Sequence, residues 1–302
     1  MEALIVITYN KTFENKDEMK NFILLCEENY KGQVINAARA IAEDSKVKFV
    51  MLSGPSCSGK TTTASILFRE LANYGKRAEV ISIDDFYRDR IKDEAKPDFE
   101  TAAAIDVDYF GECVEKLTSG REALLPIFDF NTESRSGYRP HVLEENEIIV
   151  FEGIQALYPE ILTHIPSGKR KSIYISVSDD VSAYGAYFSA RDVRFVRRIV
   201  RDFWARSSSV KRTLDLWGDV VANEEKSIIP AGKKADFIIN SLMLYEFNVM
   251  KKYIFDAVKY DLSDPEELKA YNDFKLKFEN IPEIPSALVP SDSVFREFIG
   301  KE

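Results

Sequence analysis

Hydrophobic residues along the chain form short, nearly continuous runs that alternate with longer stretches in which they recur at helical spacing. The short runs are rich in valine and isoleucine and are typical of buried strands. The pattern predicts strands at residues 3–9, 46–53, 77–83, 147–153 and 171–177, and helices at residues 17–43, 60–73 and 101–118. Such alternation is typical of an α/β fold in which a parallel sheet carries helices on both faces.

Two polar segments, residues 85–100 and 129–146, interrupt this alternation. Long irregular segments inside compact domains are often binding loops, so we expect both to contact ligands. Beyond residue 243 the pattern predicts two helices and a proline-containing tail. We therefore expect a strand–helix extension at 1–46, a central domain at 47–242, and a helical extension at 243–302 that packs on it.

Composition and residue spacing make several classes of protein improbable for this chain. The 302 residues are 45% apolar, which is enough for a packed core, and the formal charge of -9 disfavours a nucleic-acid partner. No window approaches the roughly 18 apolar residues of a membrane span, and no signal peptide is apparent. Cys26, Cys57 and Cys113 are scattered, so we expect no disulfide and a cytoplasmic protein. His141 and His164 lack partners at metal-ligand or serine-hydrolase spacing.

The stretch GPSCSGKTTT, residues 54–63, carries the most specific motif. It matches the pattern GxxxxGK[ST] and lies between an expected strand and an expected helix, which a chance turn with a surface lysine would not require. In such a loop backbone N–H groups surround a phosphate, the lysine neutralises its charge, and the hydroxyl after the lysine reaches Mg²⁺. We therefore expect ATP or GTP with Mg²⁺ at Gly54, Ser56, Cys57, Ser58, Gly59, Lys60, Thr61 and Thr62.

Carboxylates follow two of the expected strands. Asp84 and Asp85 end one strand, and Glu152 ends another. Ligands of open parallel sheets gather at the carboxyl ends of the strands, so Asp84 or Asp85 would face the terminal phosphate and accept a proton from an attacking hydroxyl. Glu152, with Thr61, would organise Mg²⁺. The alternatives are a solvated turn for the aspartates and an ordinary strand-terminating charge for Glu152.

Positive charge is concentrated at residues 191–206. On a helix, one stripe holds Arg191, Arg194, Arg198 and Arg201, opposite an apolar face. In a phosphoryl-transfer enzyme, such a stripe on a mobile lid would stabilise charge on the transferred group. The alternatives are a solvated basic face and a nucleic-acid-binding helix.

The segment PIFDFNTESR has two aromatic residues near an arginine. Phe128 and Phe130 would border a planar base, and Arg135 would hold a carbonyl or a phosphate. The alternative places the two phenylalanines in the core and makes Glu133 and Arg135 a surface pair.

Six motifs in order, GPSCSGKTT, ISIDDFY, KPDFET, PIFDFNTESR, IIVFEGIQAL and RFVRRIVRD, resemble the uridine kinase and phosphoribulokinase family of P-loop kinases over residues 47–240. The resemblance implies a P-loop fold with a helical lid near 185–210, an ATP or GTP donor, and a small hydroxylated acceptor. It also implies a base at Asp84, an acceptor pocket at Tyr87, and ribose binding at Asp98. The lid pattern matches Arg194, Arg197, Arg198 and Arg201, and a homo-oligomer is expected by family.

One position departs from the family pattern, since Glu133 stands where uridine and cytidine kinases commonly have histidine. An ionised glutamate only accepts hydrogen bonds, so it favours an amino or imino edge of a base over a carbonyl edge. The sequence predicts a nucleoside kinase with an unassigned base preference. The alternatives are a kinase for a sugar phosphate or a pantothenate-like molecule, and a nucleotide-dependent switch.

Overall fold

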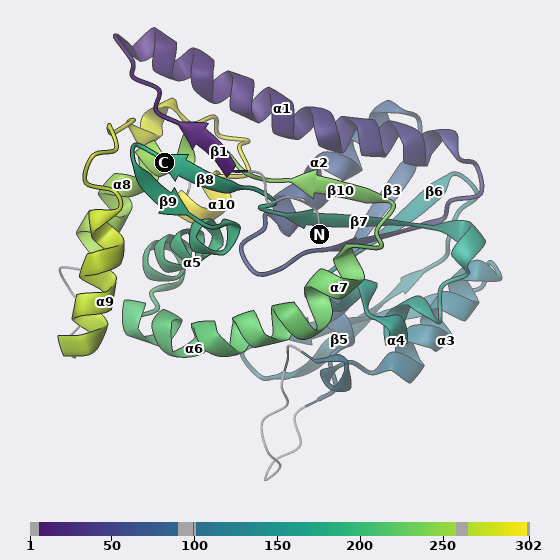
Figure 1. Ribbon diagram of the computed structural model, residues 1–302. Coiled ribbons are helices and arrows are strands. Elements are labelled where there is room, and N and C mark those ends of the chain that lie inside the picture. The colour runs from purple at the N-terminus through teal and green to yellow at the C-terminus, as the bar shows by residue number, and fades with distance from the viewer. Residues whose placement is uncertain (1–5, 90–98, 100, 258–264, 301–302) are drawn as a thin grey trace.

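The computed structural model describes residues 6–89, 99, 101–257 and 265–300. Its centre is a five-stranded parallel sheet in the order β10 (Phe237–Asn240), β7 (Arg170–Ser176), β2 (Phe49–Ser53), β6 (Glu147–Glu152), β3 (Arg77–Ser82). The parallel α/β fold predicted from the alternation is confirmed (Figure 1).

The central strand β2 explains why its sequence is apolar throughout. Val50 and Leu52 join the core cluster that contains helices α1 (Lys16–Glu43) and α2 (Lys60–Asn73), whereas Phe49 and Met51 join the cluster that contains α3 (Val107–Thr118). Successive side chains of a strand point to opposite faces, so a strand covered on both faces needs hydrophobic residues at every position.

A smaller sheet adjoins this layer. Strand β1 (Val6–Tyr9) pairs in parallel with β8 (Asp180–Ala183), which pairs antiparallel with β9 (Ala186–Phe188). Helix α1 starts one residue before the predicted helix at 17–43 and ends at the same residue. The side chain of Asn15 caps its first turn and fixes where it starts. The helix predicted from residue 101 begins only at Val107, where Asp106 provides the cap.

The prediction of an irregular segment at 129–146 is wrong for half of its length. The structure has an antiparallel hairpin of β4 (Ala123–Asp129) and β5 (Ser134–His141). Strand β5 contains no buried residue, so its SRSGYRPH sequence lacks the apolar alternation that identifies a half-buried strand. The predicted segment 85–100 begins in a 3-10 turn (Ile83–Phe86), and residues 90–98 and 100 lie outside the described part.

Helices complete the second half of the chain. They are α4 (Pro159–Leu162), α5 (Ala190–Arg206), α6 (Val210–Asn223), α7 (Ile229–Gly232), α8 (Glu246–Ala257), α9 (Pro265–Leu276) and α10 (Arg296–Ile299), with a π-helical turn (Glu224–Ile228) between α6 and α7. No helix within the described residues is long and apolar enough to cross a membrane.

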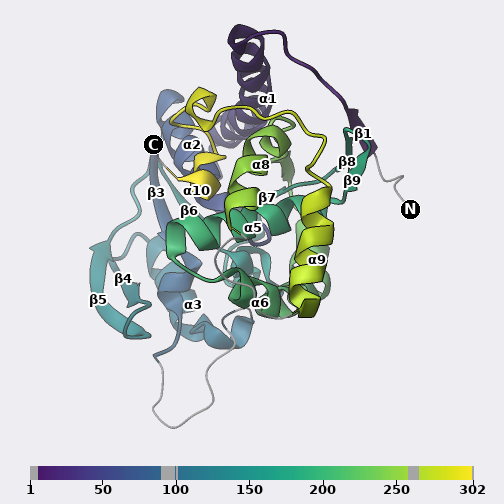
Figure 2. The ribbon, with the colours of Figure 1, turned by 90° about the vertical axis from the view of Figure 1, so that its left-hand side faces the viewer.

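The C-terminal residues pack beside the central helices. Figure 2 shows α10 next to α2 and α5, and Phe295 and Phe298 are fully buried in the cluster that also contains α1 and α2. The sequence predicted the two helices that became α8 and α9 but not α10. The final turn of the chain therefore lies close to the glycine-rich loop that precedes α2.

Candidate active site

The glycine-rich loop connects β2 to α2, as the motif predicts. A side chain at Gly54 would place its Cβ 2.1 Å from the carbonyl oxygen of Ile175, so only glycine fits there. Gly59 has a φ of +93° and caps α2. Lys60 folds back over the loop and donates to the carbonyl oxygens of Gly54 (3.0 Å) and Pro55 (3.2 Å). The loop thus presents its N–H groups and the α2 N-terminus at one end of the sheet.

One polar atom inside the loop lacks a protein partner. The Ser58 hydroxyl is fully buried, and no residue of the described chain accepts or donates a hydrogen bond to it. Buried polar atoms are almost always hydrogen-bonded, so an unpartnered one in a phosphate-type loop is consistent with a ligand that completes it.

The two adjacent aspartates after β3 have different surroundings. Asp84 is partly buried, and this burial raises the pKa of its carboxyl group, while the Tyr87 hydroxyl and the Lys60 ammonium oppose the rise. Asp85 instead accepts a hydrogen bond from the backbone N–H of Phe128 (3.2 Å). Asp84 therefore interacts with the lysine of the glycine-rich loop, whereas Asp85 holds the β4–β5 hairpin.

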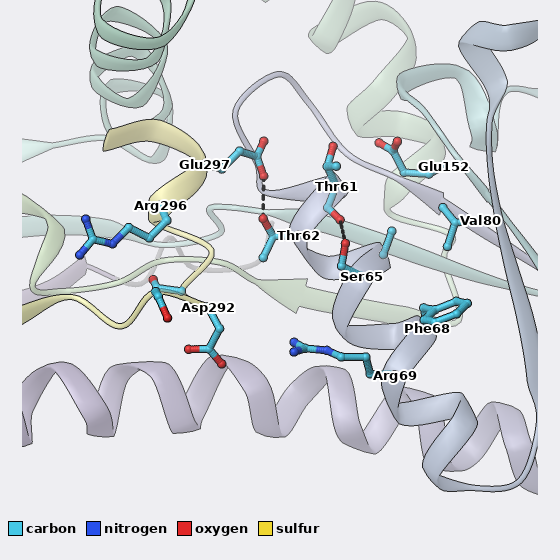
Figure 3. Close-up of a pocket in the computed structure, with 13 residues that line it drawn as sticks. Thr61, Thr62, Ser65, Phe68, Arg69, Val80, Glu152, Asp292, Arg296 and Glu297 are labelled. Carbon is cyan, nitrogen blue, oxygen red and sulfur yellow. Dashed lines mark hydrogen bonds between the residues drawn. The ribbon is translucent and has the colours of Figure 1, made fainter. Parts of the chain in front are cut away.

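Glu152, at the end of β6, lies near the same loop. Burial raises the pKa of its carboxyl group to about 7; the Lys60 ammonium opposes the rise, and the negative charges of Asp84 and Glu297 add to it. Figure 3 shows Glu152 and Thr61 lining one pocket. A partly buried carboxylate beside other carboxylates is stabilised in its ionised form by a cation.

Four aromatic rings gather beside Asp84. The Tyr87 ring lies 4.9 Å from Phe99, 5.6 Å from Phe128 and 6.2 Å from Phe130, measured between ring centroids. Phe128 is buried, as the core alternative proposed, but Phe130 is 59% exposed. The predicted ribose-binding Asp98 lies outside the described residues.

Gln155 was not predicted from the sequence. It is fully buried after β6, and its amide nitrogen donates to the Tyr87 hydroxyl (3.1 Å) and to the Phe99 carbonyl oxygen (2.5 Å). These contacts join the strand-end turn to the aromatic group. The only signal available in the sequence was a polar residue within the apolar run IIVFEGIQAL.

The hairpin positions two further predicted residues. Arg135 donates to Asp106 (2.9 Å), and its guanidinium lies 5.0 Å from the Tyr109 ring. Glu133 has a φ of +50° in the turn between β4 and β5. The partly buried Arg135 is therefore held against the start of α3, and Glu133 lies in the hairpin turn.

The arginines of α5 contact the outside of the glycine-rich loop. Arg194 forms a two-pronged ion pair with Glu224 (2.6 and 2.7 Å) and donates to the Ser56 carbonyl oxygen (3.3 Å). Arg197 is fully buried, is paired with Glu246, and donates to the Cys57 carbonyl oxygen (3.2 Å). A solvated basic face is therefore wrong for Arg194 and Arg197, whereas Arg191 of the predicted stripe is exposed and pairs with Glu225.

Arg198 and Arg201 differ from this pair. Arg198 donates to the Ser56 hydroxyl (3.1 Å), and both arginines contact Asp202 of their own helix. Arg194 and Arg197 thus hold the loop through its carbonyl groups. That Arg198 and Arg201 neutralise a bound phosphate stays a prediction. The sequence did not indicate Glu224 and Glu246 because they lie 30 and 49 residues from their partners.

A glycine-rich loop that joins the central strand of a parallel sheet to a helix, with carboxylates at the ends of two neighbouring strands, defines a P-loop nucleotide-binding protein. More specifically, the chain belongs to the phosphoribulokinase / uridine kinase family, whose model matches residues 49–246, well over half of its length. The resemblance predicted from the six motifs is confirmed.

Individual relatives are distant. Uridine-cytidine kinase A of Dictyostelium discoideum is 29% identical over 241 residues, 78% of this chain, which spans only 43% of that protein. The uridine kinase of Streptococcus equi subsp. zooepidemicus is 26% identical over 193 residues, 62% of this chain and 84% of that protein. A solved structure described as a possible uridine kinase from Bacillus stearothermophilus is 20% identical, with a TM-score of 0.43, over 74% of this chain and 99% of that chain.

Proposed function

We propose that this chain transfers the γ-phosphoryl group of ATP or GTP to the 5′-hydroxyl group of a nucleoside. The observation that carries the proposal is the placement of a partly buried carboxylate, Asp84, within the electrostatic reach of Lys60 and beside the aromatic group of Tyr87, Phe99, Phe128 and Phe130. Phosphoryl transfer to a nucleoside needs a phosphate loop, a general base and a surface that holds the acceptor in place.

In this proposal Asp84 accepts the proton of the attacking hydroxyl group. Its raised pKa makes it a stronger base than an exposed aspartate, because burial disfavours the charged form. Lys60 moves from the Gly54 and Pro55 carbonyls to the phosphate oxygens, and with Arg198 and Arg201 it stabilises their charge.

The residues present fit a magnesium ion. Thr61 and Glu152 offer oxygen ligands in one pocket, and Mg²⁺ commonly takes one or two protein carboxylates together with water and phosphate oxygens. The raised pKa of Glu152 supports a nearby cation, which would hold that carboxylate ionised. When bound, Mg²⁺ would neutralise charge on the phosphate oxygens.

Acceptor binding is assigned to the aromatic group and the hairpin. The rings would pack against the base, Gln155 would fix Tyr87, and Asp98 would bind the ribose as the family resemblance implies. Glu133 would accept a hydrogen bond from an amino or imino group of the base. The relatives named uridine kinase support this class of acceptor. A cytoplasmic location and a homo-oligomer remain predictions from the sequence.

The test is steady-state phosphoryl transfer from Mg-ATP and Mg-GTP to uridine, cytidine, adenosine, guanosine, inosine and thymidine, with direct detection of the monophosphate. We expect product from at least one nucleoside, with a preference for a base that offers a donor edge. Hydrolysis without any monophosphate would contradict the proposal and favour a different acceptor or a nucleotide-dependent switch.

A further inference from the structure

The C-terminal segment forms one wall of a cavity that opens beside the glycine-rich loop. The cavity has a volume of about 610 Å³, and its opposite wall is the outer face of α2 together with Glu152. Five residues of the C-terminal segment line it, namely Ser291, Asp292, Ser293, Arg296 and Glu297. These residues lie beyond residue 246, where the match to the family model ends.

Glu297 links this segment directly to the helix that follows the loop. Its carboxylate accepts a hydrogen bond from the hydroxyl group of Thr62 (3.1 Å), in the first turn of α2. Figure 3 shows Glu297 on the opposite side of Thr61 from Glu152. Neither Asp84 nor the four aromatic residues are among the described residues that line this cavity, so Glu297 faces a space distinct from the proposed acceptor site.

The segment that carries Glu297 is firmly held. Phe295 and Phe298 are fully buried, and Arg296 donates to the carbonyl oxygens of Val289 (2.7 Å) and Ser286 (3.0 Å). A Cβ atom on Gly59 would lie 2.5 Å from the Val294 side chain, which shows how closely the segment approaches the loop. The carboxylate of Glu297 is thus presented at a fixed place beside the phosphate cradle.

The chemistry of that place restricts what Glu297 can bind. An ionised carboxylate accepts hydrogen bonds and repels phosphate oxygens, so its partner in a nucleotide must be a hydroxyl or N–H group. When Lys60 holds the β- and γ-phosphates and the γ-phosphate faces Asp84, the α-phosphate and the ribose extend to the other side of the loop. The first hydrogen-bond donors beyond the α-phosphate are the ribose hydroxyl groups.

We propose that Glu297 accepts a hydrogen bond from a ribose hydroxyl group of the donor nucleotide and exchanges its bond with Thr62 for that contact. The C-terminal segment is then part of the donor site, and it selects ribonucleotides over dideoxynucleotides. This inference rests on the proposed function only in taking a nucleoside triphosphate as the ligand of the loop.

The test is equilibrium binding of Mg-ATP and Mg-2′,3′-dideoxy-ATP, without acceptor, to the intact protein and to Glu297→Ala. A hydrogen bond to a charged group predicts that the wild-type protein binds ATP about tenfold more tightly than the dideoxy analogue. In Glu297→Ala the preference for ATP over the dideoxy analogue should fall to about twofold or less. Glu297→Gln keeps a hydrogen-bond acceptor and should retain part of the preference. Glu283→Gln, an exposed control in the same segment and outside the cavity, should behave like the wild type.

Two results would overturn the inference. If Glu297→Ala binds both nucleotides more tightly and by the same factor, the carboxylate only repels phosphate. If both bind more weakly by the same factor, the residue has only a structural role, which thermal unfolding of the variant would register. If Glu297 discriminates between ATP and dideoxy-ATP but no nucleoside is phosphorylated, this inference stands and the proposed acceptor is wrong. If the wild-type protein binds neither nucleotide, both proposals are wrong.

Discussion

The carboxylates at the ends of β3 and β6 are close in space but differ in their partners. Asp84 interacts with Lys60 and Tyr87, Asp85 holds the backbone of Phe128, and Glu152 lines the pocket beside Thr61. A substitution that removes one negative charge while keeping the shape of the side chain can therefore separate their roles.

Asp84→Asn should lower kcat by about two to four orders of magnitude, the usual contribution of a general base, and leave ATP affinity within a few-fold of the wild type. The adjacent Asp85→Asn is a matched control, because its remaining side-chain oxygen can still accept from the N–H of Phe128. Monophosphate formation and equilibrium ATP binding check both variants. Equal losses of kcat in the two, or wild-type turnover in Asp84→Asn, would exclude Asp84 as the base.

The raised pKa of Glu152 predicts that the stability of the unliganded protein depends on pH. Between pH 4.5 and about 7 the unfolded chain has released this proton while the folded protein keeps it, so stability falls as pH rises through that range. The shift corresponds to about 3 kcal/mol, and Glu152→Gln should remove most of it. The raised pKa of Asp84 acts in the same direction and should leave a residual slope.

Urea unfolding of the unliganded protein from pH 5 to pH 8 measures this effect. We expect Glu152→Gln to be more stable than the wild type at pH 8 and similar to it at pH 5. The Glu283→Gln control alters an exposed carboxylate and should follow the wild-type profile. If the free energy of unfolding falls with pH as steeply in Glu152→Gln as in the wild type, the folded protein does not keep a proton on Glu152, which would contradict the raised pKa.

Among the elements, α5 connects the glycine-rich loop to the second half of the chain. Its arginines donate to the outer carbonyl groups of the loop and are neutralised by Glu224, next to α6, and Glu246, at the start of α8. The loop conformation thus depends on ion pairs whose acidic members come from elements later in the chain.

Glu246→Gln should destabilise the protein by about 3 kcal/mol, because it leaves the buried guanidinium of Arg197 without a counter-charge. Asp215→Asn on α6 is the control, since Asp215 and its partner Lys211 are both about half exposed and such pairs contribute about 0.5 kcal/mol or less. Chemical denaturation compares the two variants. Equal changes in the free energy of unfolding would contradict the structural role of the Arg197–Glu246 pair.

The elements also show what the sequence could and could not predict. Strand β2 and helix α1 were predictable because the apolar run of β2 is covered on both faces and a cap fixes the start of α1. The β4–β5 hairpin was missed because β5 exposes its polar residues, so backbone pairing leaves no hydrophobic pattern. Gln155, Glu246 and Glu297 were missed because their relevant contacts join residues far apart in sequence.

At the scale of the whole molecule, the chain combines the family's P-loop domain with a C-terminal segment that returns to its loop. The glycine-rich motif and the acidic strand ends predicted which edge of the sheet carries the site, because parallel strands bring their carboxyl ends together. Nothing in the sequence pattern predicted that residues near the C-terminus would line the same site, since this depends on the packing of Phe295 and Phe298.

The central claim is that the phosphoryl group moves from the donor to a nucleoside 5′-hydroxyl group. Phosphorus NMR of the protein with Mg-ATP should show nucleoside 5′-monophosphate with the best substrate of the panel and none with its 5′-deoxy analogue, which keeps the base and ribose contacts but lacks the attacking oxygen. The analogue should also inhibit the reaction competitively. Equal consumption of ATP with both compounds, yielding only inorganic phosphate, would contradict the account.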